Sequence, residues 1–433
     1  MTLVEASQRR RMDPIPLALF LCGVAVVCST AVPGMAMLRL GLLVPILVVG
    51  GLVFWGWRAP RGMFGPFEFM VSMIGLALFA SSLWAEVPSE AFRAAGSLIL
   101  TILTFIAFRY LLAAMGLRRG ASVLGLVGAI FVIVYAVSIG ASRLLESPIP
   151  AGWWMLDRGS IRFNGLAAGP GVLSICTTIL LAAAMIGWRG RPLALLATTT
   201  GAVVVIFASG SRTGLLGVLL LGIFFVATSI GRTLDDAMRR RILSTSFLLT
   251  VVGLGFVLAG YLGGLGEGIA ERFASVVHDS SRLRLWGFGL EILGEHPATG
   301  LGLGEVQQSF VAGDVVPGLG VELGAKDLWL HNTYLEIGSA AGLLALLPAG
   351  WLVVLTARAF REASDPTAGY LLVVGVFSQF AFHSLQSTSL FGLALALLAQ
   401  FVVEAREDVG ATSPGAVRFP SRSRHEAVRE VVN

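Results

Sequence analysis

Long apolar runs separated by short polar breaks make up most of the chain. An α-helix needs about 20 apolar residues to cross the ~30 Å hydrocarbon core of a bilayer. Within the runs apolar and polar residues do not alternate, so the strands of a membrane β-barrel are not indicated. The pattern predicts transmembrane helices at 15–32, 36–56, 64–84, 95–114, 119–140, 166–187, 193–208, 212–230, 244–263, 333–357, 367–383 and 388–404.

The composition favours a membrane protein over a water-soluble one. Hydrophobic residues make up 56% of the 433 residues and charged residues only 13%, whereas soluble domains carry about 25% charged residues. Inside a bilayer each helix satisfies its own backbone hydrogen bonds. We therefore predict an all-α fold, a polytopic integral membrane protein of about 12 transmembrane helices with one long periplasmic loop. The net charge of +5 then reflects topology, and nucleic acid is not an expected partner.

The positions of the arginines predict the orientation. If the N-terminus is cytoplasmic, most of the 31 Lys and Arg residues fall in cytoplasmic segments, as the positive-inside rule requires. We expect a multi-pass protein of a bacterial inner membrane, with both termini cytoplasmic and a periplasmic active face. The regions are a cytoplasmic segment at 1–14, helices 1–9 at 15–263, the long periplasmic loop at 264–332, helices 10–12 at 333–404, and a disordered cytoplasmic tail at 405–433.

The long loop contains one amphipathic stretch, from Ser281 to Glu295, in which large apolar residues recur at helical spacing. We expect a short helix lying at the membrane surface. Further along, Gly300, Gly302 and Gly304 resemble a nucleotide-binding loop. No predicted strand precedes them, so we interpret them as a flexible turn.

No metal or other cofactor is expected. The three cysteines, Cys22, Cys28 and Cys176, lie in apolar runs and do not have the spacing of metal ligands. The sequence also contains no Asp-x-Asp motif and no set of His, Cys and Glu that suggests a metal site.

Arginines at the starts of outward-facing helices form a candidate anion site. A helix N-terminus offers free N–H groups and the positive end of the helix dipole, and an added arginine favours phosphate. Arg212 begins one such span and Arg162 precedes another, while Arg282 and Arg284 lie on the amphipathic stretch. The alternative for each is structural, as an arginine that extends to the headgroups, anchors a loop or is solvated.

His331 is a candidate general base. Thr333 and Glu336 follow it with the spacing of a capping box. This places His331 just outside a helix, on the face that carries the arginines, where a neutral imidazole can take a proton from a sugar hydroxyl. Glu336 is then a capping residue, and Glu336→Gln is expected to be mild. The alternative is a structural histidine, and His383 is a weaker candidate.

Three motifs occur in the order found in one family of bacterial membrane proteins. The first motif is Ser209-Gly210-Ser211-Arg212-Thr213-Gly214. The second is Arg282-Leu-Arg284-Leu-Trp286, continuing to His296-Pro297-x-x-Gly300-x-Gly302-x-Gly304. The third is His331-Asn332-Thr333-Tyr334-Leu335, continuing to Gly342-Leu343-Leu344. With these motifs the chain resembles the O-antigen ligase and polysaccharide polymerase superfamily over about residues 160–350.

The resemblance implies a metal-independent glycosyltransferase that takes a glycan from an undecaprenyl-diphosphate carrier at the periplasmic face. It implies that Arg212 and Arg284 hold the diphosphate and stabilise the leaving group, with Arg162 and Arg282 as further candidates. His331 would activate the acceptor hydroxyl. The expected partners are the lipid-linked donor, a second lipid-linked glycan or lipid A-core as acceptor, the bilayer, and a polysaccharide export machinery.

Several functions stay open at this point. The breadth of the superfamily favours a polymerase of exopolysaccharide or O-antigen repeat units, and the alternative is a ligase that attaches O-antigen to lipid A-core. A transporter of lipid-linked oligosaccharides or small solutes would need charges deep in the spans and symmetry between halves. Glu68 and Arg109 instead lie near the inner ends of spans. A non-catalytic assembly partner is a further alternative.

Overall fold

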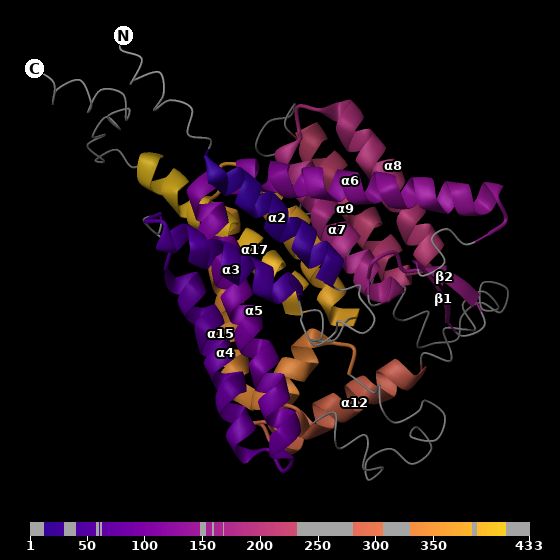
Figure 1. Ribbon diagram of the computed structural model, residues 1–433. Coiled ribbons are helices and arrows are strands. Elements are labelled where there is room, and N and C mark those ends of the chain that lie inside the picture. The colour runs from indigo at the N-terminus through magenta and orange to yellow at the C-terminus, as the bar shows by residue number, and fades with distance from the viewer. Residues whose placement is uncertain are drawn as a thin grey trace, which may run out of the picture.

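The structure is a computed structural model that describes residues 13–29, 40–57, 60, 63–147, 153–157, 160–167, 169–231, 280–305, 330–382 and 388–412. Nearly every element in these ranges is a helix (Figure 1), and the predicted all-α, polytopic membrane fold is confirmed. The segment 1–12, the predicted span 244–263, His383 and the tail from 413 onward lie outside the described residues.

Seven of the described helices are long and apolar enough to cross a membrane, and four shorter apolar helices accompany them. These segments coincide with all the predicted spans except 244–263. The elements are α2 (Pro14–Ser29), α3 (Leu40–Phe54), α4 (Pro66–Ser81), η1 (Ser82–Trp84), α5 (Pro88–Met115), α6 (Leu117–Leu144), β1 (Trp154–Asp157), β2 (Ser160–Phe163), α7 (Pro170–Gly187), α8 (Pro192–Ser209), α9 (Arg212–Gly231), α12 (Ser280–Glu295), α15 (Thr333–Glu362), α16 (Thr367–Tyr370), η3 (Leu371–Val376), η4 (Phe377–Phe382) and α17 (Thr388–Thr412).

Proline sets the starts of several helices. α4, α5, α7 and α8 begin at Pro66, Pro88, Pro170 and Pro192. The fixed φ of proline suits the first helical position, where its missing N–H is not needed. Pro88 starts α5 earlier than the span predicted at 95–114, because the first turns of α5 are helical without being apolar.

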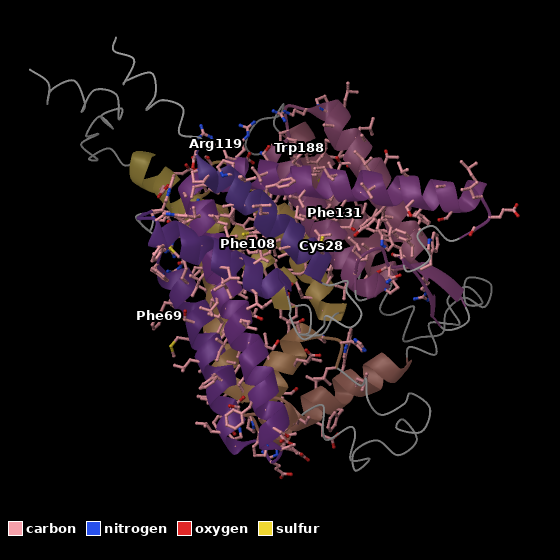
Figure 2. The ribbon with its side chains drawn as sticks, in the orientation of Figure 1. Cys28, Phe69, Phe108, Arg119, Phe131 and Trp188 are labelled. Carbon is pink, nitrogen blue, oxygen red and sulfur yellow. The ribbon has the colours of Figure 1, made fainter. Side chains whose placement is uncertain are left out.

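Glycines on α6 let α7 pack against it at close range. A Cβ at Gly125 would lie 2.7 Å from the Cα of Ala184, and small residues at such contacts let helix backbones approach in a bilayer. α7 and α17 are the most enclosed spans, each with 78% of its apolar stretch buried. Figure 2 shows Phe108 within the bundle and Phe69 at its edge, with exposed fractions of 0% and 58%. Apolar side chains at this edge are suited to contact with lipid.

The all-α prediction needs one addition, an antiparallel β-hairpin of β1 and β2 in the segment between α6 and α7. The ring of Tyr135 on α6 packs edge-on against Trp153 and Phe163, at centroid distances of 5.3 and 5.5 Å. Such aromatic contacts bury a large apolar area. They anchor the hairpin at the end of α6 and fix the strand that carries Arg162.

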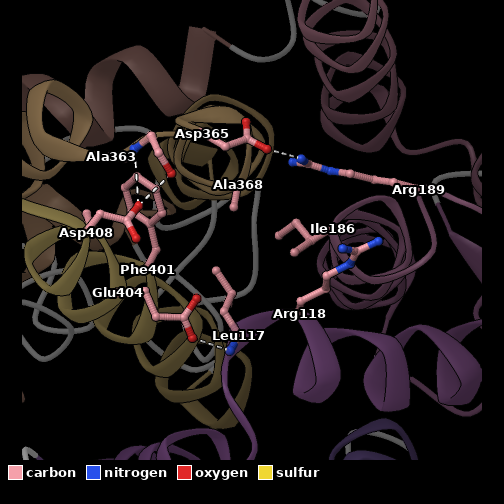
Figure 3. A pocket seen from close by; sticks show the side chains of 12 residues that line it. Leu117, Arg118, Ile186, Arg189, Ala363, Asp365, Ala368, Phe401, Glu404 and Asp408 are labelled. Carbon is pink, nitrogen blue, oxygen red and sulfur yellow. Dashed lines mark hydrogen bonds and ion pairs between the residues drawn. The ribbon is translucent and has the colours of Figure 1, made fainter. Parts of the chain in front are cut away.

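Turns that the positive-inside rule assigns to the cytoplasm contact one another at one end of the bundle. The N–H of Leu117 donates to Glu404 at 2.6 Å, and Arg189 forms an ion pair with Asp365. These residues line a cavity of about 340 Å³ (Figure 3). Burial by itself raises the pKa of the Asp365 carboxyl, but hydrogen bonds from Thr367 and the charge on Arg189 outweigh it and hold that pKa well below its usual range. Asp365 is therefore ionised at neutral pH.

A buried charged cluster joins α4, α5 and α17 near the same end. Arg109, which is 1% exposed, donates from Nε to Glu68 at 2.5 Å and also donates to the side-chain oxygen of Gln400. Gln400 donates to Glu404 at 2.8 Å. Glu68 also accepts from the N–H of Gly65 at 2.9 Å. Charges at this depth are costly unless they are paired, so this cluster has a structural role that the sequence pattern did not reveal.

Candidate functional site

The first motif forms the turn between α8 and α9. Gly210 ends α8 with a φ of 62°, a left-handed conformation that suits glycine. The Oγ of Ser211 accepts from the N–H of Gly214 at 3.2 Å, which caps α9. The same hydroxyl donates to Ser174 of α7 at 2.8 Å. A Cβ at Gly214 would lie 2.6 Å from that of Ser174, so the glycine allows α7 and α9 to meet where Arg212 begins.

Two of the candidate arginines lie at this turn, Arg212 within the chain that forms it and Arg162 on β2. Arg212 is the first residue of α9, and its side chain lies outside the described part of the chain. The side chain of Arg162 on β2 lies over the turn, with its Nε 3.5 Å from the position of a Cβ on Gly210. The hairpin thus brings a guanidinium group close to the start of α9. This juxtaposition is what the predicted anion site requires.

The second motif begins in α12, whose first turns contain Arg282 and Arg284. The side chains of both arginines lie outside the described part. The buried stripe of α12 consists of Leu285, Phe288 and Ile292. Two residues along a helix correspond to about 200° around its axis, so the positions of the two arginines lie on opposite flanks of this stripe. The stripe packs against Leu330, so α12 rests on protein, whereas we predicted that its apolar face lies in the membrane surface.

Trp286 ties α12 to the residue before His331. Its indole N–H donates to the carbonyl of Leu330 at 3.0 Å. Farther along, the Oγ of Ser339 on α15 donates to the carbonyl of Gly289 on α12 at 3.0 Å. Figure 1 shows α12 running from the lower ends of α4 and α15 toward the side of the view on which the hairpin lies. The second and third motifs are therefore in direct contact.

His331 occupies an unusual backbone conformation. Its φ is 50°, which is uncommon for a residue other than glycine and is typical of positions constrained by their surroundings. The side chain is half-buried. On one side the carbonyl of Leu330 accepts from Trp286, and on the other side α15 begins. His331 is therefore held between two fixed elements.

The capping box predicted for α15 is wrong. Asn332 is the N-cap, and its side-chain oxygen accepts from the N–H groups of Tyr334 and Leu335, each at 3.1 Å. An asparagine oxygen reaches the free N–H groups of the first turn, so Thr333 becomes the first helical residue and is buried. Glu336 then lies one position beyond the box and is 8% exposed. The capping argument for a mild Glu336→Gln effect therefore no longer applies.

The glycine-rich part of the second motif is not a flexible turn, because it fits into a break in α15. The break is at Gly342, whose φ is 57°. The carbonyls of Ser339 and Ala340 lose their usual partners within the helix at this point. They accept instead from the N–H groups of Leu301 and Gly302, at 2.8 and 3.0 Å.

The N–H groups beyond the break are satisfied in the same way. Leu343 and Leu344 donate to the carbonyls of Pro297 and Ala298, at 2.8 and 3.4 Å. Irregular backbone within a membrane protein is tolerated where protein groups replace the lost hydrogen bonds. The predicted span 333–357 therefore consists of two helical pieces, and the second motif supplies the hydrogen bonds that allow the break.

We expect Gly300→Ala to destabilise the protein by on the order of 3 kcal/mol. The φ of Gly300 is 65°, and a Cβ there would lie 2.5 Å from the backbone nitrogen of Ala341. The control is Gly294→Ala on α12, where a Cβ meets nothing within 4 Å and the expected change is within about 0.5 kcal/mol. Thermal unfolding in detergent measures both. Equal melting temperatures for the two variants would show that the glycine fit contributes little.

Three polar residues hold the motifs in place although sequence reasoning gave them no role. Trp286 and Ser174 make the bonds described above, and the hydroxyl of Tyr334 donates to the carbonyl of Phe377 at 2.7 Å. Trp286 and Tyr334 stand within the motifs, so their positions were a usable signal. Ser174 lies in an apolar run, and nothing in the sequence pairs it with Ser211. Across the described ranges, no three His, Cys, Asp or Glu residues gather as metal ligands would.

Residues 193–350 match the family model described as O-antigen ligase. This range contains all three motifs, and with them the α8–α9 turn, α12 and the break in α15. A search of curated proteins finds no match for this chain. The resemblance predicted from the motifs is therefore confirmed, because over residues 193–350 this membrane protein is similar to the O-antigen ligase family.

Proposed function

We propose that the protein transfers a glycan from an undecaprenyl-diphosphate carrier to an acceptor hydroxyl at the periplasmic face of a bacterial inner membrane. The observation that carries the proposal is the contact between the second and third motifs. Trp286 holds the residue before His331, and residues 297–302 fill the break in α15. The family match supports glycan transfer as the reaction.

Arg212 and Arg284 bind the donor diphosphate in this proposal, and Arg162 and Arg282 are further contributors. The position of Arg162 over the turn that precedes α9 supports it, because a guanidinium group and a helix N-terminus both favour phosphate. Negative charge builds up on the diphosphate as its oxygen separates from the anomeric carbon. Fixed positive charges stabilise that leaving group, and we propose that they do so without a metal ion.

His331 acts on the acceptor. The acceptor oxygen attacks the anomeric carbon of the donor sugar while the imidazole takes the hydroxyl proton, which later passes to solvent. The bond from the anomeric carbon to the carrier breaks, and undecaprenyl diphosphate leaves. The constrained backbone at His331 and the cap at Asn332 support this role, because a base that is already oriented saves the cost of ordering it.

The first test is reconstitution of the full chain in vesicles with undecaprenyl-diphosphate-linked repeat units, with and without lipid A-core, read on gels. Ladders that form without lipid A-core establish a polymerase, which the breadth of the superfamily favours. Product that requires lipid A-core establishes a ligase, which the description of the matched family favours. No product in either mixture, with folded protein, contradicts glycan transfer and favours a transporter or an assembly partner.

Arg212→Ala and Arg284→Ala are each expected to lower transfer by about 100-fold or more, because each removes a charge that stabilises the leaving group. Transfer and donor binding are measured in the same vesicles, at matched membrane abundance. Arg282→Ala is the comparison for Arg284→Ala, since the two positions lie on opposite flanks of α12. If a variant keeps full activity, the residue that it replaces does not belong to the proposed diphosphate site.

A further inference from the structure

The segment 371–382 is irregular along its whole length. η3 is a π-helix and η4 is a 3₁₀-helix, whereas the apolar run predicted an ordinary span. Such irregular turns are rare inside helices and are frequent at functional sites. The segment packs against α9, which begins at Arg212, and also against α15, which begins next to His331. It therefore lies between the helices that carry the first and third motifs.

The contact with α9 is an interlocking one. Gln379 of η4 is buried, at 2% exposed, and its side chain lies over Gly217 of α9. A Cβ at Gly217 would lie 2.7 Å from the Cδ of Gln379 and closer still to its Nε2. Four residues earlier, in η3, a Cβ at Gly375 would overlap the side chain of Leu221 on α9. Each partner thus supplies a glycine against a larger side chain of the other, which fixes the distance between them.

The contact with α15 includes a directed hydrogen bond. Tyr334, three residues after His331, donates from its hydroxyl to the carbonyl of Phe377 at 2.7 Å. Phe377 is the first residue of η4 and follows directly on the π-helix. A backbone carbonyl at such a junction is available to an outside donor because the regular hydrogen-bond pattern changes there.

We propose that the segment 371–382 sets the spacing between the start of α9 and the start of α15, with Gln379 and Tyr334 as its positioning residues. The inference rests on the proposed function, because the spacing matters only if Arg212 and His331 act on one donor and acceptor pair. Neither positioning residue touches substrate. Each acts through a helix that has a candidate site residue at its start, Arg212 as the first residue of α9 and His331 just before the N-cap of α15.

Gly217→Ala is expected to lower kcat by on the order of 10- to 100-fold, because the added methyl group separates α9 from η4, and small misplacements have effects of this size. Binding of undecaprenyl diphosphate is measured in vesicles, separately from transfer. Its Kd is expected to stay within about 2-fold of wild type, since the first motif is intact. The matched control is Gly222→Ala on the same helix, where a Cβ meets nothing within 4 Å, and it is expected to keep wild-type kcat.

A compensating change makes this test independent of general instability. Gln379→Ala vacates the space that the methyl group of Gly217→Ala needs, so the double variant is expected to recover a large part of the lost kcat. If Gly217→Ala has the same kcat as Gly222→Ala, or if the double variant is no better than Gly217→Ala, the spacing role is wrong.

Tyr334→Phe examines the second contact and is also expected to lower kcat by about 10-fold with unchanged donor Kd. Its control is Ser378→Ala, whose hydroxyl donates to Val374 in the same segment. Arg212→Ala and His331→Ala, run in parallel, separate two kinds of failure. If these two variants keep wild-type transfer, the roles proposed for Arg212 and His331 fail, and the spacing proposal that rests on them fails with them. If they are inactive while Tyr334→Phe and Gly217→Ala match their controls, only the spacing proposal fails.

Discussion

Replacing His331 with alanine is expected to lower the rate of glycan transfer by about 100-fold or more. In the proposed reaction the imidazole removes the acceptor proton, and the half-buried, left-handed backbone at this position holds it in one orientation. The donor diphosphate binds elsewhere, so donor affinity is expected to be unchanged. The measurement is single-turnover transfer in vesicles at saturating donor, with donor binding determined separately.

The control for this variant is His296→Ala, which replaces an exposed histidine directly after α12. It is expected to keep wild-type transfer. If His331→Ala weakens donor binding and leaves the transfer step unchanged, His331 belongs to the diphosphate site instead. If transfer is unchanged in every respect, the base is another group, and buried Glu336 near the start of α15 is the next candidate.

Replacing Arg109 with methionine is expected to destabilise the protein by about 3–5 kcal/mol, because it leaves Glu68 as a buried, unpaired charge. The ion pair is almost fully enclosed, with side-chain exposures of 1% and 3%. It also joins α5 to α17 through Gln400. Thermal unfolding in detergent and the amount of protein in the membrane are the measurements.

The double variant Glu68→Leu/Arg109→Met distinguishes the effect of an unpaired buried charge from the effect of lost side-chain packing. It removes both charges, so it is expected to be clearly more stable than Arg109→Met alone. Arg118→Met, at an exposed arginine at the same end of the bundle, is the control for the loss of a surface charge. A double variant no more stable than Arg109→Met would show that the cost comes from packing and not from an unpaired charge.

The positions and order of the described apolar helices could be predicted because a bilayer imposes one strong rule, a long apolar run for each crossing. The same rule explains what could not be predicted. Hydropathy averages over many residues, so it does not detect the break at Gly342 or the π- and 3₁₀-helical turns of 371–382. Apolar residues surround both features, and only backbone conformation distinguishes them from regular helix.

The candidate site was predictable to the extent that its residues are close in sequence. Ser211 and Arg212 form one turn, and His331 directly precedes the cap of α15. Contacts between distant segments were not predictable from one sequence. Trp286 meets Leu330 across 44 positions, and Arg109 meets Glu68 across 41. The glycines of the second motif were misread for the same reason, since their partner is α15.

The break in α15 also bears on how the protein is assembled. A helix that enters the bilayer as a regular span satisfies its own backbone, but α15 is interrupted at Gly342 and takes its missing partners from residues 297–302. These residues are made by the ribosome before α15. Membrane insertion of α15 therefore cannot by itself complete its native shape, and docking of the earlier segment becomes a late step in biogenesis.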